Sequence, residues 1–146
     1  AHDPFVIALA PDHPLLLQAE EKEGYEYPVL DVTLLKDEKF LMLHSQQRIR
    51  QVTDSVLQKA GIARPNILMT LKNFETAQLL AAKNMGITLV PKQYTQLSAK
   101  QDLPAFCSID TKYDASWDMC ITALKNSFFS KADQLFIRIA RELFAG

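Results

Sequence analysis

The sequence of 146 residues predicts an α/β fold with a largely parallel sheet. Short apolar segments alternate with amphipathic segments of about a dozen residues, which is the order that βαβ units produce. Hydrophobic residues make up 48% of the chain and charged residues 23%. These proportions are ordinary for a globular protein and argue against a disordered chain, a collagen-like chain or a coiled coil. The length is sufficient for one domain or for two small lobes that share a hinge.

Four buried strands are predicted in the first two-thirds of the chain, because each segment is a short apolar run rich in strand formers. They span residues 5–10, 39–43, 67–71 and 87–90. Pro11 closes the first strand and Pro91 stops the fourth, since proline cannot donate to a ladder. Between the first two strands we expect a solvated loop or short helix at residues 18–27 and one or two helical turns at residues 32–37.

Two amphipathic helices separate the last three of these strands. The first follows Ser45, a residue type that is favoured at the N-cap, and ends at Gly61, which can adopt the left-handed conformation. Its apolar face consists of Ile49, Val52, Val56, Leu57 and Ala60. The second helix is capped by Asn73 and ended by Gly86. Its apolar stripe consists of Phe74, Ala77, Leu80, Ala81 and Met85.

The C-terminal third contains a connector, two further strands and a helix. Residues 95–103 form the polar connector, and the strands span residues 105–109 and 119–124. The helix starts near Ser130, where Ser130-x-x-Asp133 is a variant of the capping box. Its predicted buried face consists of Leu135, Phe136, Ile139, Ala140, Leu143 and Phe144.

Charge and cysteine content exclude several classes of protein. The chain has 16 basic and 17 acidic residues, a net charge of −1, so it lacks the basic excess of a nucleic-acid-binding domain. Cys107 and Cys120 are too few for a disulfide framework, and we expect both to be small buried apolar residues in a reducing cytoplasm. No signal peptide is visible, and no apolar run approaches the ~20 residues of a membrane span. We therefore expect a cytoplasmic protein without a membrane partner.

The sequence gives no support for catalysis or metal binding. His2, His13 and His44 have no ligand-like spacing to a second His, Cys or carboxylate. The chain contains no Gly-x-Ser-x-Gly elbow, no Walker A motif and no Gly-x-Gly-x-x-Gly. We accordingly expect no catalytic residues, no metal and no cofactor.

A binding site is predicted where strands end and helices begin. In open α/β sheets, ligands lie beyond the carboxyl ends of strands, where helix N-termini favour anions. Residues 43–48 form one such junction, with adaptable polar side chains at Ser45, Gln46 and Gln47, and residues 71–76 form another. A capped helix start with exposed polar residues is an equally good interpretation of the first junction and the better interpretation of the second.

Four segments, in this order, resemble the LysR-type transcriptional regulators. They are VIALAPDHPL at residues 6–15, VTLLKDEKFL at 32–41, LQKAG at 57–61 followed by Pro65, and AAKNMGITLVP at 81–91. The C-terminal helix fits as well, so the resemblance covers nearly the whole chain. Each motif alone is weak, whereas the ordered set is fairly specific.

The resemblance implies an effector-binding domain with a type II periplasmic-binding-protein-like fold, one lobe complete and the other partial. Residues 1–94 would hold a hinge strand and the inserted regulatory lobe II, and residues 95–146 would be the return segment of regulatory lobe I. The N-terminal winged helix-turn-helix and the first half of lobe I are absent, so DNA would be bound only through that missing part. Residues 16–27 are longer than the family's usual connection.

The resemblance also implies a small-molecule effector, held between the lobes, that biases the angle between them. Ser45, Gln46 and Gln47 carry over as effector-binding residues, and Phe74, Pro91 and Lys92 are added from their position near the hinge. Lys92, Arg48 and the helix N-termini favour an organic anion. Two alternatives remain: a solute-binding protein of a transporter and a small α/β enzyme.

The missing half-lobe predicts self-association as a dimer or tetramer. Strands 105–109 and 119–124 would normally lie beside strands that this chain lacks. Their unpaired edges would favour pairing with a second copy.

Overall fold

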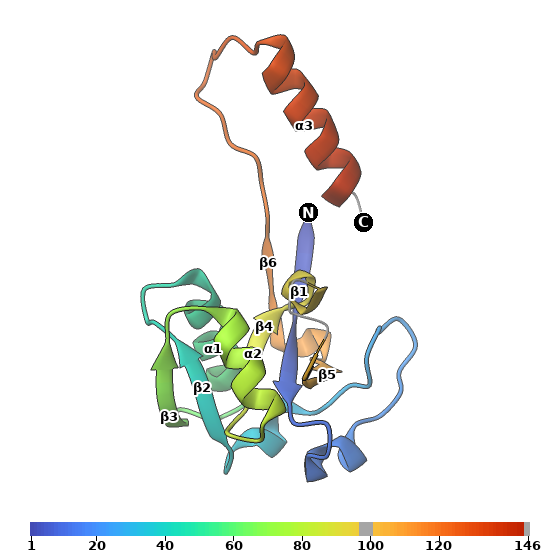
Figure 1. Ribbon diagram of the computed structural model, residues 1–146, viewed down its shortest axis with the longest axis vertical. Helices are drawn as coiled ribbons and strands as arrows, with labels where there is room; N and C mark the ends of the chain where they lie inside the picture. Colours follow the sequence, from blue (N-terminus) through green and yellow to red (C-terminus); the bar gives the residue numbers. More distant parts are fainter. Residues whose placement is uncertain (97–100, 145–146) are drawn as a thin grey trace.

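β1 (His2–Leu9) is the central strand of a four-stranded sheet and pairs with three antiparallel strands. The computed structural model describes residues 1–96 and 101–144 (Figure 1). β4 (Thr88–Pro91) and β5 (Ala105–Ser108) pair with the C-terminal half of β1, and β6 (Ser116–Asp118) pairs with residues 2–4. Residues 97–100 of the predicted connector lie outside the described residues.

A second, two-stranded sheet consists of β2 (Lys39–Leu43) and β3 (Asn66–Leu71), which run parallel. A parallel bridge joins β2 to the start of β4, where Ile87 accepts from Leu41 N–H and donates to Lys39 O, both at 2.8 Å. The prediction of a largely parallel sheet is therefore wrong for the half around β1. Apolar periodicity identifies a buried strand but carries no information about its direction.

Gly86 makes the close approach of β2 and β4 possible. A Cβ at this position would lie 2.8 Å from the Lys39 carbonyl oxygen. The second helix has already ended at Ala82, and Asn84 (φ 58°) takes the left-handed turn. The helix-ending role predicted for Gly86 is thus wrong, and its lack of a side chain serves sheet packing instead.

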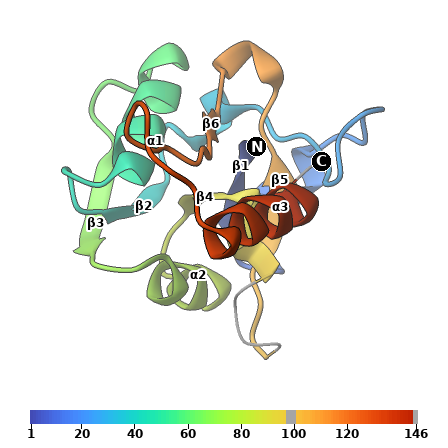
Figure 2. The same cartoon turned by 90° about the horizontal axis from the view of Figure 1, so that it is seen from above.

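α1 (Arg48–Lys59) and α2 (Phe74–Ala82) lie on opposite sides of the β2–β3 pair (Figure 2). Gly61 has φ 79° beyond the end of α1, and Asn73 Oδ1 accepts from Thr76 N–H at 2.8 Å, as predicted. The N-cap of α1 is Gln47, so the prediction of Ser45 is wrong. A turn closed by Gln47 N–H donating to His44 O, at 3.0 Å, delays the helix by two residues.

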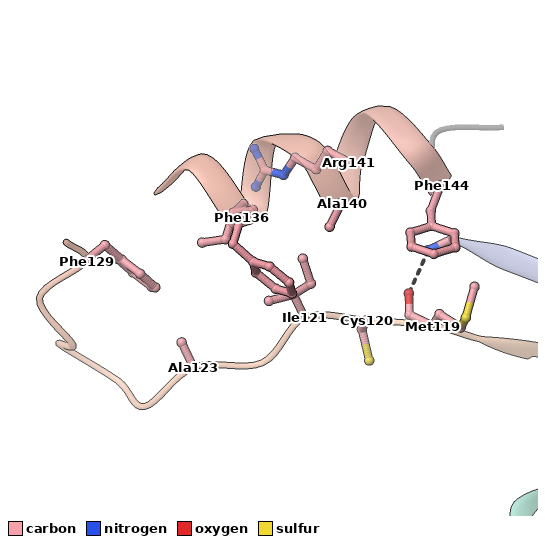
Figure 3. A pocket seen from close by; sticks show the side chains of 11 residues that line it. Met119, Cys120, Ile121, Ala123, Phe129, Phe136, Ala140, Arg141 and Phe144 are labelled. Carbon is pink, nitrogen blue, oxygen red and sulfur yellow. Dashed lines mark hydrogen bonds between the residues drawn. The ribbon is translucent and has the colours of Figure 1, made fainter. Parts of the chain in front are cut away.

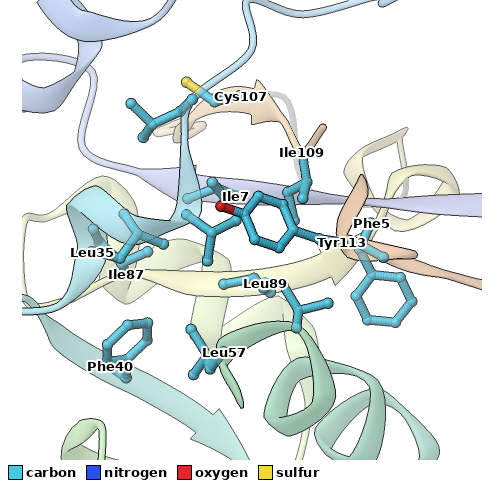
Figure 4. Close-up of a cluster of buried hydrophobic side chains, with 14 of the residues drawn as sticks. Phe5, Ile7, Leu35, Phe40, Leu57, Ile87, Leu89, Cys107, Ile109 and Tyr113 are labelled. Carbon is cyan, nitrogen blue, oxygen red and sulfur yellow. The ribbon is translucent and has the colours of Figure 1, made fainter. Parts of the chain in front are cut away.

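The strands carry apolar side chains on both faces, because neighbouring residues of a strand point to opposite sides. The larger core includes Ile7, Phe40 and Leu57, and the smaller one on the other face consists of Ala8, Leu41 and Ala81 (Figure 4 shows the larger). Four short 3₁₀ segments complete the described lobe. They are η1 (Pro14–Gln18), η2 (Val32–Leu35), η3 (Lys92–Gln96) and η4 (Thr111–Tyr113).

The larger core continues past residue 94, where the sequence places the division between lobes. Cys107, Ile109, Tyr113 and Ala115 all belong to it. Burial raises the pKa of the Cys107 thiol to about 11, so this cysteine is the inert packing residue that the sequence predicts. Cys120 is exposed, so the same prediction is wrong for it.

α3 (Lys131–Phe144) lies apart from the lobe, at the end of an extended segment that follows β6 (Figure 1). Its capping box is confirmed: Ser130 Oγ accepts from Asp133 N–H at 3.2 Å, and Asp133 Oδ2 accepts from Ser130 N–H at 2.8 Å. The predicted burial of its apolar face is wrong, since no residue of α3 is buried. The strand predicted at 119–124 is also wrong, because the ladder ends at Asp118 and residues 119–130 form no helix or strand.

Candidate functional site

The structure brings the two predicted junctions together at one edge of the sheet. β2 and β3 run parallel with Leu43 opposite Leu71, so both strands end at the same level. α1 begins just beyond β2 and α2 just beyond β3. Gln47 joins the junctions, because its Nε2 donates to the Lys72 carbonyl oxygen at 3.0 Å.

The N-terminus of α1 is the more open of the two helix starts. Among the described residues no side chain caps it, whereas Asn73 caps α2. Ser45 and Gln46 are exposed and Gln47 is half-buried. Uncapped first-turn N–H groups of a helix form an anion-binding surface that the helix dipole strengthens. The three polar side chains directly precede this helix start in the chain.

The Gln47 side chain has one unused hydrogen-bonding atom. Its Nε2 must face the Lys72 carbonyl, so Oε1 faces away from it; Oε1 is buried and has no partner among the described residues. A buried acceptor without a donor is unfavourable. This position therefore favours a ligand that brings a hydrogen-bond donor, such as a hydroxyl group, beside its anionic group.

Phe74 forms an aromatic wall next to the junctions. It is the first residue of α2 and stacks on Tyr94, with ring centroids 4.1 Å apart and planes at 24°. Tyr94 forms a T-shaped pair with Trp117, with ring centroids 5.9 Å apart. Sequence reasoning missed Tyr94 and Trp117. The available signals were the proximity of Tyr94 to Lys92 in the chain and the presence of a single Trp.

Pro91 and Lys92 are placed differently from the other predicted site residues. Pro91 is buried in β4 opposite Phe5. Lys92 Nζ forms an ion pair with Glu26 and lines a cleft of about 340 Å³ against β1 and residues 24–26. None of Ser45, Gln46, Gln47 or Phe74 lines that cleft. The structure thus groups Ser45, Gln46, Gln47 and Phe74 around the strand ends and separates Lys92 and Pro91 from them.

A second hollow lies between α3 and the segment that leads to it (Figure 3). Its volume is about 860 Å³, and its walls are largely apolar, including Ile121, Phe129, Phe136 and Phe144. Arg141 is the one charged side chain among the residues that line it. This hollow is remote from the predicted site residues and has the character of an uncovered packing surface.

Within residues 1–96 and 101–144, no group of three His, Cys, Asp or Glu side chains could hold a metal ion. In the same part of the chain, no helix combines the length and the apolar character that crossing a membrane requires.

Comparison with known proteins gives one consistent result. The family model described as LysR substrate binding domain matches residues 1–145. A curated relative, the uncharacterized HTH-type transcriptional regulator YcgK of Bacillus subtilis (strain 168), is 24% identical over 123 residues, which is 84% of this chain and 36% of the relative. The chain therefore spans well under half of that relative's length.

Solved structures match over nearly the whole chain. The regulatory domain of Synechocystis PCC6803 CcmR in complex with 2-PG has a TM-score of 0.71 at 17% identity, covering 97% of this chain and 63% of that one. The BenM effector binding domain with its effector benzoate has a TM-score of 0.69 at 19% identity, covering 99% and 61%. The QuiR effector binding domain with shikimate has a TM-score of 0.64 at 18% identity, covering 97% and 61%. Less than two thirds of each solved domain is represented in this chain.

Proposed function

The chain belongs to the LysR substrate-binding domain family, and from this we propose that it is the part of a transcriptional regulator that senses a small molecule. Its fold is the type II periplasmic-binding-protein-like fold of LysR effector-binding domains. The observation that carries the proposal is the pairing of two helix N-termini beside an aromatic wall, joined by Gln47.

The proposed effector is an organic anion that also carries a hydrogen-bond donor. Ser45, Gln46 and the uncapped N–H groups of α1 would hold the anionic group. Gln47 Oε1 would accept from the donor, and Phe74 would pack against the apolar part. Benzoate and shikimate, the ligands of BenM and QuiR, are both carboxylates, which supports the anionic group. Shikimate also carries hydroxyl donors, whereas benzoate has none. Lys92 and Pro91 would act by placing η3 rather than by direct contact.

The proposed mechanism is a shift between two arrangements of the lobes. A ligand can move that equilibrium only by its difference in affinity for the two arrangements. We propose that a helix-turn-helix outside these residues reads the DNA and that the protein acts in the cytoplasm. We also propose that the chain works as a homo-oligomer, a dimer or a tetramer, which the exposed apolar face of α3 supports.

The test is calorimetric titration of the 146-residue chain with benzoate and with shikimate, followed by thermal shift. A ligand at 100 times its Kd should stabilise the fold by roughly 2.7 kcal/mol. Gln46→Ala should weaken binding about tenfold, the value of one lost charge-assisted hydrogen bond. Gln58→Ala is the matched control, because Gln58 is exposed on the same helix near its other end.

Two results would count against the proposal. If Gln46→Ala and Gln58→Ala bind equally well, the site lies elsewhere. If neither carboxylate nor other small organic acids bind at all, a structural or protein-interaction role becomes the better explanation of this chain.

A further inference from the structure

Four side chains from four elements form a continuous contact between the candidate effector site and the paired strands β1 and β6. Phe74 at the start of α2 stacks on Tyr94 of η3 at 4.1 Å. Tyr94 forms a T-shaped pair with Trp117 in β6, with ring centroids 5.9 Å apart, and Trp117 forms another with Phe5 in β1, with centroids 5.5 Å apart. Aromatic pairs at these distances and angles are favourable beyond the area they bury.

Asp3 anchors the far end of this contact. It is 1% exposed, and its carboxylate accepts from Trp117 Nε1 at 3.1 Å and from the Gln93 backbone N–H at 3.2 Å. Asp3 and Trp117 are also directly opposite one another in the β1–β6 ladder. One buried carboxylate thus ties β6 to η3, and a buried acceptor of this kind depends on both donors.

α2 holds η3 at a second point, one turn along the same face. Gln78 is 1% exposed, and its Nε2 donates to the Tyr94 carbonyl oxygen at 3.3 Å. Phe74 and Gln78 are four residues apart and lie on the same face of α2. Phe74 therefore contacts the ring of Tyr94 while Gln78 bonds to its backbone. Because of these two contacts, a displacement of the N-terminus of α2 would also displace η3.

We propose that Tyr94 and Trp117 are positioning residues that couple the candidate effector site to the β1–β6 pair, with Asp3 as the anchor. This proposal rests on the proposed function, because it assumes that a ligand acts beside Phe74. β6 leads into the segment that carries α3 (Figure 1). A shift in the position of Trp117 would therefore change the direction in which that segment leaves the lobe.

The chain provides its own reporter, since Trp117 is its single tryptophan. The test measures Trp117 emission and acrylamide quenching in the ligand-free 146-residue chain. Phe74→Leu should shift the emission to longer wavelength and increase quenching. In a Tyr94→Leu background, the same substitution should cause no further change, because the link between the two rings is already lost.

Tyr27→Leu is the matched control. It removes a different aromatic pair, Tyr27 with Phe106 at 5.6 Å, that does not include Trp117. This control should leave the emission of Trp117 unchanged. The proposal would be overturned if Phe74→Leu left the emission of Trp117 unchanged in a chain whose circular dichroism shows native helix content. It would also be overturned if Phe74→Leu shifted the emission equally in the wild-type and Tyr94→Leu backgrounds.

A second measurement applies if Phe74→Leu does not fold. An amide in place of the Asp3 carboxylate removes the charge and leaves one acceptor oxygen for two donors. Asp3→Asn should therefore speed hydrogen exchange at the Gln93 amide and leave the Thr76 amide, which Asn73 caps, unchanged. Equal protection of the Gln93 amide in both chains would contradict the anchor role. The fluorescence and hydrogen-exchange measurements are made without ligand. They can therefore contradict the coupling while benzoate or shikimate still binds at residues 45–47, and they can support it while neither ligand binds.

Discussion

Asp31 is a residue whose pKa is lowered by hydrogen bonds to its carboxylate. Its carboxylate accepts from the Thr33 N–H and hydroxyl, both at 3.0 Å, and from the Tyr113 hydroxyl at 2.7 Å. The Thr33 N–H, followed by the Tyr113 hydroxyl, lowers the pKa of Asp31 from 3.8 to about 2. Burial, followed by the same hydrogen bond to Asp31, raises the pKa of Tyr113 from 10.0 to about 12. Asp31 thus caps η2 and links it to η4.

The folded pKa of Asp31 predicts acid sensitivity. Because it lies below the unfolded value of 3.8, the contribution of Asp31 to stability is complete above that pH and is lost as the pH falls toward about 2. Tyr113→Phe removes one donor and should return the pKa of Asp31 toward its ordinary value. The free energy of unfolding in urea should then fall less steeply between pH 4 and pH 2, the range over which the pKa of Asp31 is shifted.

Tyr25→Phe is the control for this prediction. The Tyr25 hydroxyl accepts from the Thr111 backbone N–H and is not bonded to a carboxylate. Its loss should leave the acid slope unchanged. If Tyr113→Phe and Tyr25→Phe show the same slope, the hydrogen bond from Tyr113 does not hold the pKa of Asp31 down.

At the scale of elements, the starts of α1 and α2 differ in the way that the candidate site requires. α2 has a side-chain cap from Asn73, whereas the N-cap residue of α1, Gln47, makes no such hydrogen bond with its side chain. At a capped start, a side chain already satisfies a first-turn N–H group and stabilises the helix. An uncapped start beside polar side chains is available to a ligand.

This difference predicts unequal effects of two substitutions. Asn73→Ala should lower the free energy of unfolding by about 1 kcal/mol, the usual cost of losing an N-cap. Ser45→Ala should change it by less than about 0.5 kcal/mol, because Ser45 is exposed and does not cap α1. Urea unfolding followed by circular dichroism measures both. Equal losses would mean that Ser45 caps the helix in solution.

For the whole molecule, the main consequence of the structure is the uncovered apolar face of α3. Phe136 is 64% exposed and Leu143 72% exposed. Apolar surface gathered in one place marks an interaction site or an aggregation hazard. We therefore attribute the predicted self-association to the apolar face of α3 and no longer to unpaired strand edges. β5 pairs with β1 on one side, and on its other side Ser108 bonds to Pro28 and Leu30, so its edge is partly covered.

We expect the isolated chain to form dimers or tetramers in light scattering. Phe136→Glu combined with Leu143→Glu should shift it to monomers, because burying either carboxylate in an apolar contact is costly. Arg138→Gln, on the same helix but outside the predicted apolar face, is the control and should leave the oligomer intact. A monomeric wild-type chain at high concentration would contradict this expectation.

The local features predicted from the sequence were those that depend on neighbouring residues. The strand at 39–43, the cap at Asn73, the left-handed Gly61 and the capping box at Ser130 all follow from side-chain chemistry within a few positions. Ser45 failed as a cap because a turn at His44 delayed the helix, and a turn depends on backbone angles that the residue types there do not specify.

The candidate site was partly predictable for the same reason. Ser45, Gln46 and Gln47 were predicted because a strand end followed by a helix start is visible in the residue pattern. Tyr94, Trp117 and Asp3 were not predicted because their contacts join segments that are not neighbours in the chain. Tyr94 lies about 20 positions from Phe74 and from Trp117, and Asp3 lies 90 positions from Gln93 and 114 from Trp117. Lys92 forms an ion pair with Glu26, a contact that residue spacing does not encode.

By itself, the sequence determined the α/β character, the positions of most strands and helices, and the family to which the chain belongs. These depend on apolar periodicity and on short ordered motifs, which are properties of neighbouring residues. Only the tertiary structure decided strand direction, the exposure of α3 and the contact from Phe74 to Asp3. Burial and direction arise from which distant segments pack together, and an amphipathic helix has the same sequence pattern whether or not a partner covers it.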